Sequence, residues 1–154
     1  MIVLDATVVN VALPSIRDDL RFTETSLVWA VNAYMLTFGG SLLLGGRLGD
    51  IFGQRRMFLL GITWFTVASL ACGLANTRNL FIAARAVQGF GGAVVVAVAL
   101  SLIANVFTAG PERAKAVGVY GFVCAGSSSI GLLVGGALTS LLSWHWIFLV
   151  NVPV

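Results

Sequence analysis

Residues 45–56 read GGRLGDIFGQRR, a short glycine-rich and charged run between two long apolar stretches. Ser26–Leu44 comes before this run and Met57–Ala75 follows it, and neither stretch contains a charged side chain. Because the hydrocarbon core of a bilayer is about 30 Å thick, about 20 apolar residues in a helix are enough to cross it. The run therefore predicts a tight connector between two membrane helices.

The composition of the whole chain supports a membrane protein. Of its 154 residues, 58% are hydrophobic and only 10% are charged, and the mean hydropathy is +0.99. A soluble domain contains about 25% charged residues, so this chain has too little polar surface for a water-soluble globule. We expect an all-α, polytopic membrane helical bundle.

Charge, histidine and cysteine usage narrow the function classes. The net charge of +3 comes from basic residues that lie singly or in pairs between apolar stretches, so no nucleic-acid partner is expected. One histidine and two cysteines, Cys72 and Cys124, offer no set of metal ligands, because both cysteines lie within apolar stretches. We expect no metal, no cofactor and no enzymatic activity.

The chain divides into five predicted spans and the start of a sixth. The first span runs to about Ile16, and the others cover about Ser26–Leu48, Met57–Ala75, Leu80–Phe107 and Ala114–Leu142. The final segment, SWHWIFLVNVPV, predicts a short loop that opens a sixth helix. We expect residues 1–154 to form one N-terminal bundle that is incomplete at both ends.

Basic residues predict the orientation of this bundle. The connectors on one side hold Arg47, Arg55, Arg56, Arg113 and Lys115, whereas those on the other side hold Arg17, Arg21 and Arg78. Since lysine and arginine are enriched in cytoplasmic loops, the excess places residues 45–56 in the cytoplasm. The opposite boundary carries Trp29, Trp144 and Trp146, and indoles favour the membrane interface.

Two charged side chains fall inside the predicted spans. Asp5 lies near mid-membrane, about 16 Å before Ile16 along a helix. It is either a proton-binding site or a packing residue that is hydrogen-bonded to Thr7, Asn10 or another neighbour. Arg85, with Gln88 on the same helix face, either lines a polar cavity or extends towards the outer surface.

Glycines mark two further candidate segments. Gly131 and Gly135 form a GxxxG pattern beside Gly136, which allows close helix packing or rocking between helices. In the connector, Gly46, Gly49 and Gly53 allow a compact turn, and Arg55 and Arg56 can hold the inner interface. Asp50, at its centre, could cap a helix or pair with Arg113 or Lys115.

Several motifs together resemble the fourteen-helix drug:proton antiporter branch of the major facilitator superfamily. LDATVVNVALP (4–14) resembles the first-helix signature of that branch, and GRLGDIFGQRR (46–56) its cytoplasmic signature between helices two and three. RAVQGFGGA (85–93) and GLLVGGAL (131–138) resemble its fourth-helix and fifth-helix motifs. The tail WHWIFLVNVP is also typical of the branch, although Leu132 stands where the fifth-helix motif usually has proline.

The resemblance implies a multi-pass cell-membrane transporter that exports small hydrophobic or drug-like compounds by proton-coupled alternating access. It implies that the proton-coupling cavity involves Asp5, Asn10, Arg85 and Gln88, and that the cytoplasmic gate motif comprises Gly46, Asp50, Gly53, Arg55 and Arg56. It also implies that Gly131, Gly135 and Gly136 form the antiporter-motif helix. The implied partners are a small-molecule substrate, protons, the lipid bilayer and the remaining C-terminal helices of the transporter.

Two alternatives remain open from the sequence. One is a different major facilitator activity, such as uptake of another solute. The other is a truncated membrane fragment that does not transport. The 154 residues alone are not expected to transport, because half of the cavity wall and the partner surface of the gate motif are absent.

Overall fold

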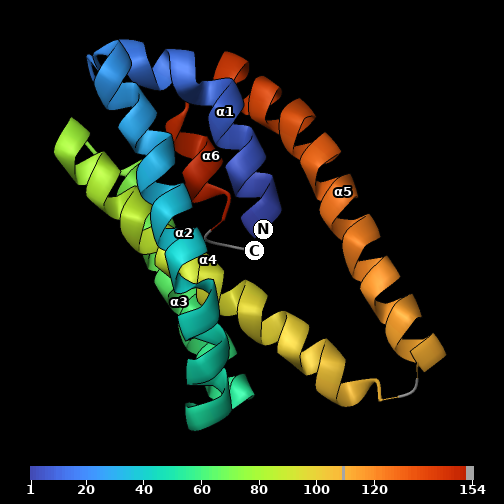
Figure 1. Ribbon diagram of the computed structural model, residues 1–154. Coiled ribbons are helices and arrows are strands. Elements are labelled where there is room, and N and C mark those ends of the chain that lie inside the picture. Colours follow the sequence, from blue (N-terminus) through green and yellow to red (C-terminus); the bar gives the residue numbers. More distant parts are fainter. Residues whose placement is uncertain (109, 152–154) are drawn as a thin grey trace.

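The computed structural model describes residues 1–108 and 110–151, and their regular structure is entirely α-helical (Figure 1). The helices are α1 (Ile2–Asp19), α2 (Glu24–Phe52), α3 (Gln54–Gly73), α4 (Arg78–Val106), α5 (Gly110–Leu141) and α6 (His145–Leu149). The predicted all-α class is confirmed, and the helix order agrees with the predicted segments.

Four helices in the described ranges, α2 to α5, are long and apolar enough to cross a membrane. The first predicted span forms α1, which continues beyond Ile16 to Asp19 and carries four charged residues, so its composition is less apolar. Three of these charges gather at its C-terminal end, which leaves Asp5 as the one charge within the rest of the helix. The predicted sixth helix is present as the short α6.

The connector predicted at residues 45–56 is present but is much shorter than expected. Helix α2 continues through Phe52, and Gly53 alone separates it from the start of α3 at Gln54. Gly53 has φ +92°, a conformation that glycine adopts without the steric cost of a side chain. Packing explains the longer helix, because a Cβ at Gly45 would lie 2.9 Å from Val94 Cα of α4. Gly53 therefore forms the turn that this run suggested, whereas Gly45 serves a helix contact.

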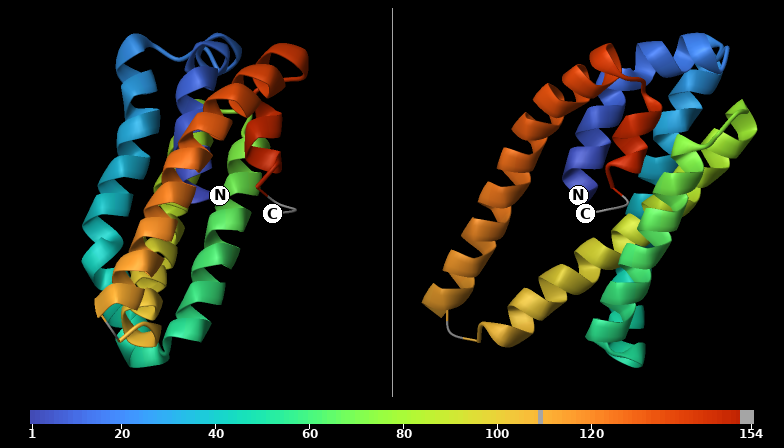
Figure 2. Two further views of the ribbon diagram at one scale, coloured as in Figure 1. Left: turned by 90° about the vertical axis from the view of Figure 1, so that its right-hand side faces the viewer. Right: turned by 180° about the vertical axis from the view of Figure 1, so that it is seen from behind.

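The helices form two groups. Helices α2, α3 and α4 form one group, α1 and α5 form the other, and α6 lies between them (Figures 1 and 2). Small residues allow the close contacts of α4: a Cβ at Gly89 would lie 2.5 Å from Tyr34 O on α2, and one at Gly91 would lie 2.7 Å from Phe65 N on α3. Such small residues are a common basis of helix association in membranes.

An aromatic cluster closes the bundle where α1 turns into α2. Phe81 forms edge-to-face contacts with Phe22, Trp144 and Phe148, at centroid distances of 6.1, 5.8 and 5.6 Å. Trp144 is only 4% exposed, and its Nε1 donates to Asp19 Oδ2 at 3.0 Å. Trp144 is therefore packed against protein rings and a carboxylate within the bundle.

Candidate functional site

A cluster of buried polar side chains lies where the two helix groups meet. Asp5 comes from α1, Arg85 and Gln88 from α4, Ser69 from α3, and Asn151 follows α6. Each of these five side chains is at most 2% exposed. Buried ionisable groups within a membrane bundle are costly and commonly mark a functional path, so this cluster is the candidate site.

The central contact is an ion pair between residues that lie 80 positions apart. Arg85 Nη1 donates to Asp5 Oδ2 at 2.9 Å and to Gln88 Oε1 at 2.7 Å. Gln88 Nε2 donates to Asp5 Oδ1 at 3.0 Å. The amide orientation follows from chemistry, since arginine can only donate and an ionised carboxylate can only accept. Arg85, Gln88 and Asp5 thus form a closed triangle of hydrogen bonds.

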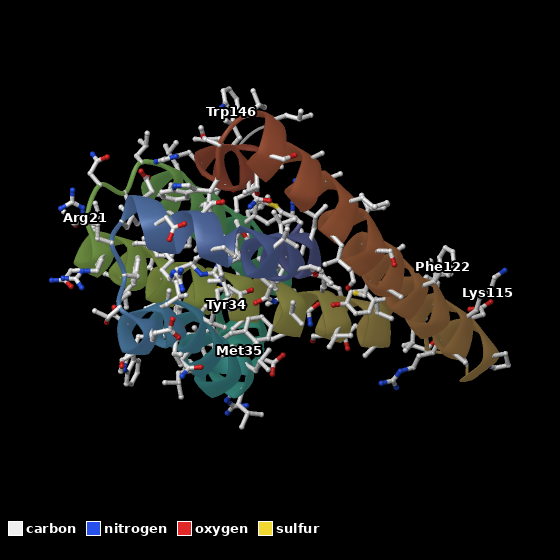
Figure 3. All side chains as sticks on the ribbon, turned by 90° about the horizontal axis from the view of Figure 1, so that it is seen from above. Arg21, Tyr34, Met35, Lys115, Phe122 and Trp146 are labelled. Carbon is white, nitrogen blue, oxygen red and sulfur yellow. The ribbon has the colours of Figure 1, made fainter. Side chains whose placement is uncertain are left out.

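The rest of the guanidinium has a different environment. Its Cζ lies 4.2 Å from the centroid of the Tyr34 ring, a cation–π contact. In the view from above, Tyr34 lies towards the middle of the bundle (Figure 3). Within residues 1–108 and 110–151, Arg85 Nε is buried without a hydrogen-bond partner. Arg85 therefore keeps a spare donor, and the interpretation in which it extends to the outer surface is wrong.

The structure does not bring Asn10 into this cluster. Its side chain is exposed and donates to Ala6 O at 3.1 Å, and Thr7 Oγ1 donates to Val3 O at 2.8 Å. Both side chains satisfy carbonyls of their own helix, so neither reaches Asp5. The alternative in which Thr7 or Asn10 satisfies Asp5 is therefore wrong.

The sequence did not predict two members of the cluster, Ser69 and Asn151, nor Tyr34, whose ring lies against Arg85. Asn151 Nδ2 donates to Asp5 Oδ1 at 2.9 Å and to Ser69 Oγ at 3.1 Å. A single amide in the apolar run IFLVNV was an available signal for Asn151. Ser69 and Tyr34 carried no comparable signal, because hydroxyl groups are frequent in membrane helices.

The fifth-helix glycines lie behind Asp5. A Cβ at Gly131 would lie 3.2 Å from Leu4 O, and one at Gly135 would lie 2.8 Å from Val8 Cγ1. These two glycines therefore face the turn of α1 that carries Asp5. Gly136 does not share this contact, since a Cβ there would meet nothing within 4 Å.

The charged run lies at the far end of α2 and α3 from the aromatic cluster. Asp50 lies within α2 and is exposed, so it cannot cap the start of a helix. Over residues 1–108 and 110–151, it forms no ion pair with Arg113 or Lys115, which lie apart at the start of α5 (Figure 1). Both expectations for Asp50 were wrong, because α2 extends through it and α5 diverges from α2.

The remaining gate-motif residues lie around the same helix junction. Gly46 lies within α2 with nothing within 4 Å of an added Cβ, and Gly53 forms the break between α2 and α3. Arg55 and Arg56 are exposed in the first turn of α3. Gln54 Nε2 donates to Ser101 Oγ at 2.7 Å and fixes this end of α3 to α4. The hydrogen bond of Gln54 therefore fixes this part of the motif to α4, whereas Arg55 and Arg56 remain exposed.

An apolar cavity of about 290 Å³ lies beside the first turn of α1. The view from behind shows that α4 and α5 diverge from each other (Figure 2). The walls of the cavity come from α1, α3, α4 and α5, and its lining includes Val3, Phe58, Phe65, Val96, Tyr120 and Cys124. Figure 3 shows the outlying end of α5, with Lys115 and Phe122, beyond this region.

The whole chain, residues 1–154, matches the family model described as Major Facilitator Superfamily. The chain belongs to the major facilitator superfamily. This membership confirms the predicted resemblance, and with the four span candidates it identifies a multi-pass membrane protein of a superfamily of transporters, not of enzymes.

Several proteins that are similar in sequence to this chain have names that refer to antibiotics. The chain is 51% identical over 154 residues to the puromycin resistance protein pur8 of Streptomyces alboniger and 47% identical over 154 residues to the cephamycin export protein CmcT of Amycolatopsis lactamdurans. It is 42% identical over 158 residues to the lincomycin resistance protein of Streptomyces lincolnensis. All of the chain is covered, but only 31%, 32% and 32% of these relatives. The chain thus spans about a third of their length.

Proposed function

We propose that this chain is part of a proton-coupled exporter of small hydrophobic or drug-like compounds that works by alternating access. The observation that carries the proposal is the buried ion pair between Asp5 and Arg85, at 2.9 Å. The superfamily membership and the names of the relatives support the transport class and the type of compound. The apolar lining of the cavity beside α1 favours a hydrophobic substrate.

Asp5 would carry the proton. In the described arrangement its two oxygens accept hydrogen bonds from Arg85, Gln88 and Asn151. Addition of a proton to one carboxylate oxygen would neutralise Asp5 and remove the negative charge that holds the guanidinium. Arg85 would stay charged, so it would need another counter-charge or water. Proton binding on one side and release on the other would thus make and break the ion pair once in each cycle.

The position of the ion pair explains how this chemistry would move helices. Asp5 belongs to the group that contains α1 and α5, whereas Arg85 belongs to the group that contains α2, α3 and α4. Breaking the pair removes a strong contact between the groups. Because Gly131 and Gly135 have no side chains where α5 contacts α1, α1 could shift along α5. A change of one proton is thereby converted into relative motion of helices.

We also propose that residues 45–56 lie in the cytoplasm and take part in a gate, as the excess of basic residues on that side favours. Ile51, which is 62% exposed, offers a labelling site. In a background without Cys72 and Cys124, Ile51→Cys should react with a membrane-impermeant maleimide in inside-out vesicles but not in intact cells. Asn76→Cys, between α3 and α4, should show the opposite pattern. Labelling of Ile51→Cys in intact cells would contradict the orientation.

The test of function uses a chimera in which residues 1–154 replace the matching segment of the Streptomyces alboniger relative, with radiolabelled puromycin as the probe. Cells that express the chimera should accumulate less puromycin than control cells, and an uncoupler that dissipates the proton gradient should abolish the difference. Higher accumulation than in control cells would indicate uptake. Equal accumulation, with the chimera present in the membrane, would indicate a segment that does not support transport. Either result would contradict the proposal.

A further inference from the structure

Asn151 connects three parts of the bundle at the candidate site. It lies two residues after the end of α6 and is 2% exposed, and its Nδ2 group donates both to Asp5 on α1 and to Ser69 on α3. An amide NH₂ group has two hydrogens, so these two bonds use all of its donors. Asn151 has no hydrogen bond to Arg85 in the described part of the chain.

We propose that Asn151 is a positioning residue that holds the Asp5 carboxylate in the rotamer that binds Arg85. The inference rests on the proposed function and adds a residue that acts on the proton site through the carboxylate oxygen that Arg85 does not bind. Asn151 occupies Asp5 Oδ1 together with Gln88, and Oδ2 is thereby left to Arg85 Nη1. Two donors on one oxygen and the guanidinium on the other fix the plane of the carboxylate.

The direction of each hydrogen bond supports a fixed geometry. Ser69 Oγ donates its proton to Phe148 O at 3.0 Å, so its lone pairs remain for Asn151 Nδ2. Asn151 must present its NH₂ group to Asp5, because a carboxylate only accepts. Asn151 thus donates to Asp5 and to Ser69, and Ser69 in turn donates to the backbone of α6. While Asp5 is ionised, donor and acceptor cannot exchange roles in any of these bonds.

Packing holds Asn151 in place. α6 lies against α3 at Gly73, where an added Cβ would come within 3.3 Å of His145 O and Leu149 Cγ. Phe148 is fully buried in the aromatic cluster described above. Because α6 is anchored on α3 independently of Asp5, it supplies a reference point for the carboxylate that remains when the ion pair to Arg85 breaks.

The test compares Asn151→Leu with Asn105→Leu in the chimera. Asn105 is exposed near the end of α4, so its substitution is a matched control. Loss of a buried hydrogen bond to a charged group lowers a rate or equilibrium constant that depends on it by about tenfold or more. We therefore expect the rate of proton-driven puromycin export by Asn151→Leu to fall by at least that factor. Proton-independent counterflow of puromycin and its KM should stay within about twofold of the unmodified chimera, because the effect acts through Asp5. Asn105→Leu should change neither activity.

A second variant keeps the test informative if Asn151→Leu does not reach the membrane. Ser69→Ala removes the acceptor that orients Asn151, and proton-driven export should fall by a smaller factor while counterflow is retained. Equal loss of counterflow and export in both variants would show a purely structural role and overturn the inference. Unchanged export in both would also overturn it. If Asp5→Asn itself leaves proton-driven export unchanged, the proposed function fails instead, which is a separate result.

Discussion

Replacement of Arg85 by methionine should lower the free energy of unfolding of the chain by about 3–5 kcal/mol, the usual cost of removing one partner of a buried ion pair. The Asp5 carboxylate would remain buried with amide donors alone, and an uncompensated charge in a membrane bundle is costly. Methionine fills most of the volume of the arginine stem, so the loss of charge dominates over a cavity. Reversible denaturation in detergent micelles, followed by circular dichroism, would measure the change.

A matched control and a rescue variant separate charge from packing. Arg78 is exposed at the start of α4, so Arg78→Met should change the free energy of unfolding by no more than about 0.5 kcal/mol. In the double variant Asp5→Asn/Arg85→Met, the buried charge is gone, and much of the lost stability should return. Equal effects of Arg85→Met and Arg78→Met would contradict the ion pair, as would a double variant less stable than Arg85→Met.

Substitution of Asp5 by asparagine should abolish proton-driven export by the chimera, which we expect to fall to the background of cells without transporter. Asparagine keeps the shape of the side chain and one acceptor for Arg85, but it leaves the guanidinium without a counter-charge, so the amount of each variant in the membrane is measured together with its export. Asparagine cannot bind and release a proton in the physiological range. Proton-independent counterflow of puromycin, which only needs the helices to alternate, should therefore continue.

Asp18→Asn provides the control for this substitution. Asp18 lies at the end of the same helix with its side chain 75% exposed, in an ion pair with Arg17 that contributes little at the surface. Export by Asp18→Asn should match the unmodified chimera. Retained uphill export by Asp5→Asn would exclude Asp5 as the proton carrier, and loss of counterflow together with export would assign it a structural role.

Features that depend on local sequence were predictable. Long uncharged stretches define the helices α2 to α5, and the i, i+3 spacing of Arg85 and Gln88 places both on one face of α4. The need of a buried guanidinium for an acceptor was also evident from the sequence. The identity of that acceptor was not, because Asp5 lies 80 residues away and only the packing of α1 decides whether it reaches α4.

Features that depend on tertiary packing were missed or misjudged. The glycine-rich run at residues 45–56 suggests a turn by composition, yet Gly45 and Gly49 pack against Val94 and Val98 of α4 within a helix that continues to Phe52. Trp144 fits a membrane interface by position, yet its neighbours in space bury it. Asn151 gained its role from the placement of α6 against α3, which no local pattern encodes.

The most direct test of the account is proton movement itself. Purified chimera in proteoliposomes that contain a pH-sensitive dye should move protons when puromycin is added to one side, and Asp5→Asn should move none while still exchanging labelled puromycin. That result would identify Asp5 as the group through which proton and substrate movements are coupled. Substrate-induced proton movement of equal size in Asp5→Asn would contradict the central claim.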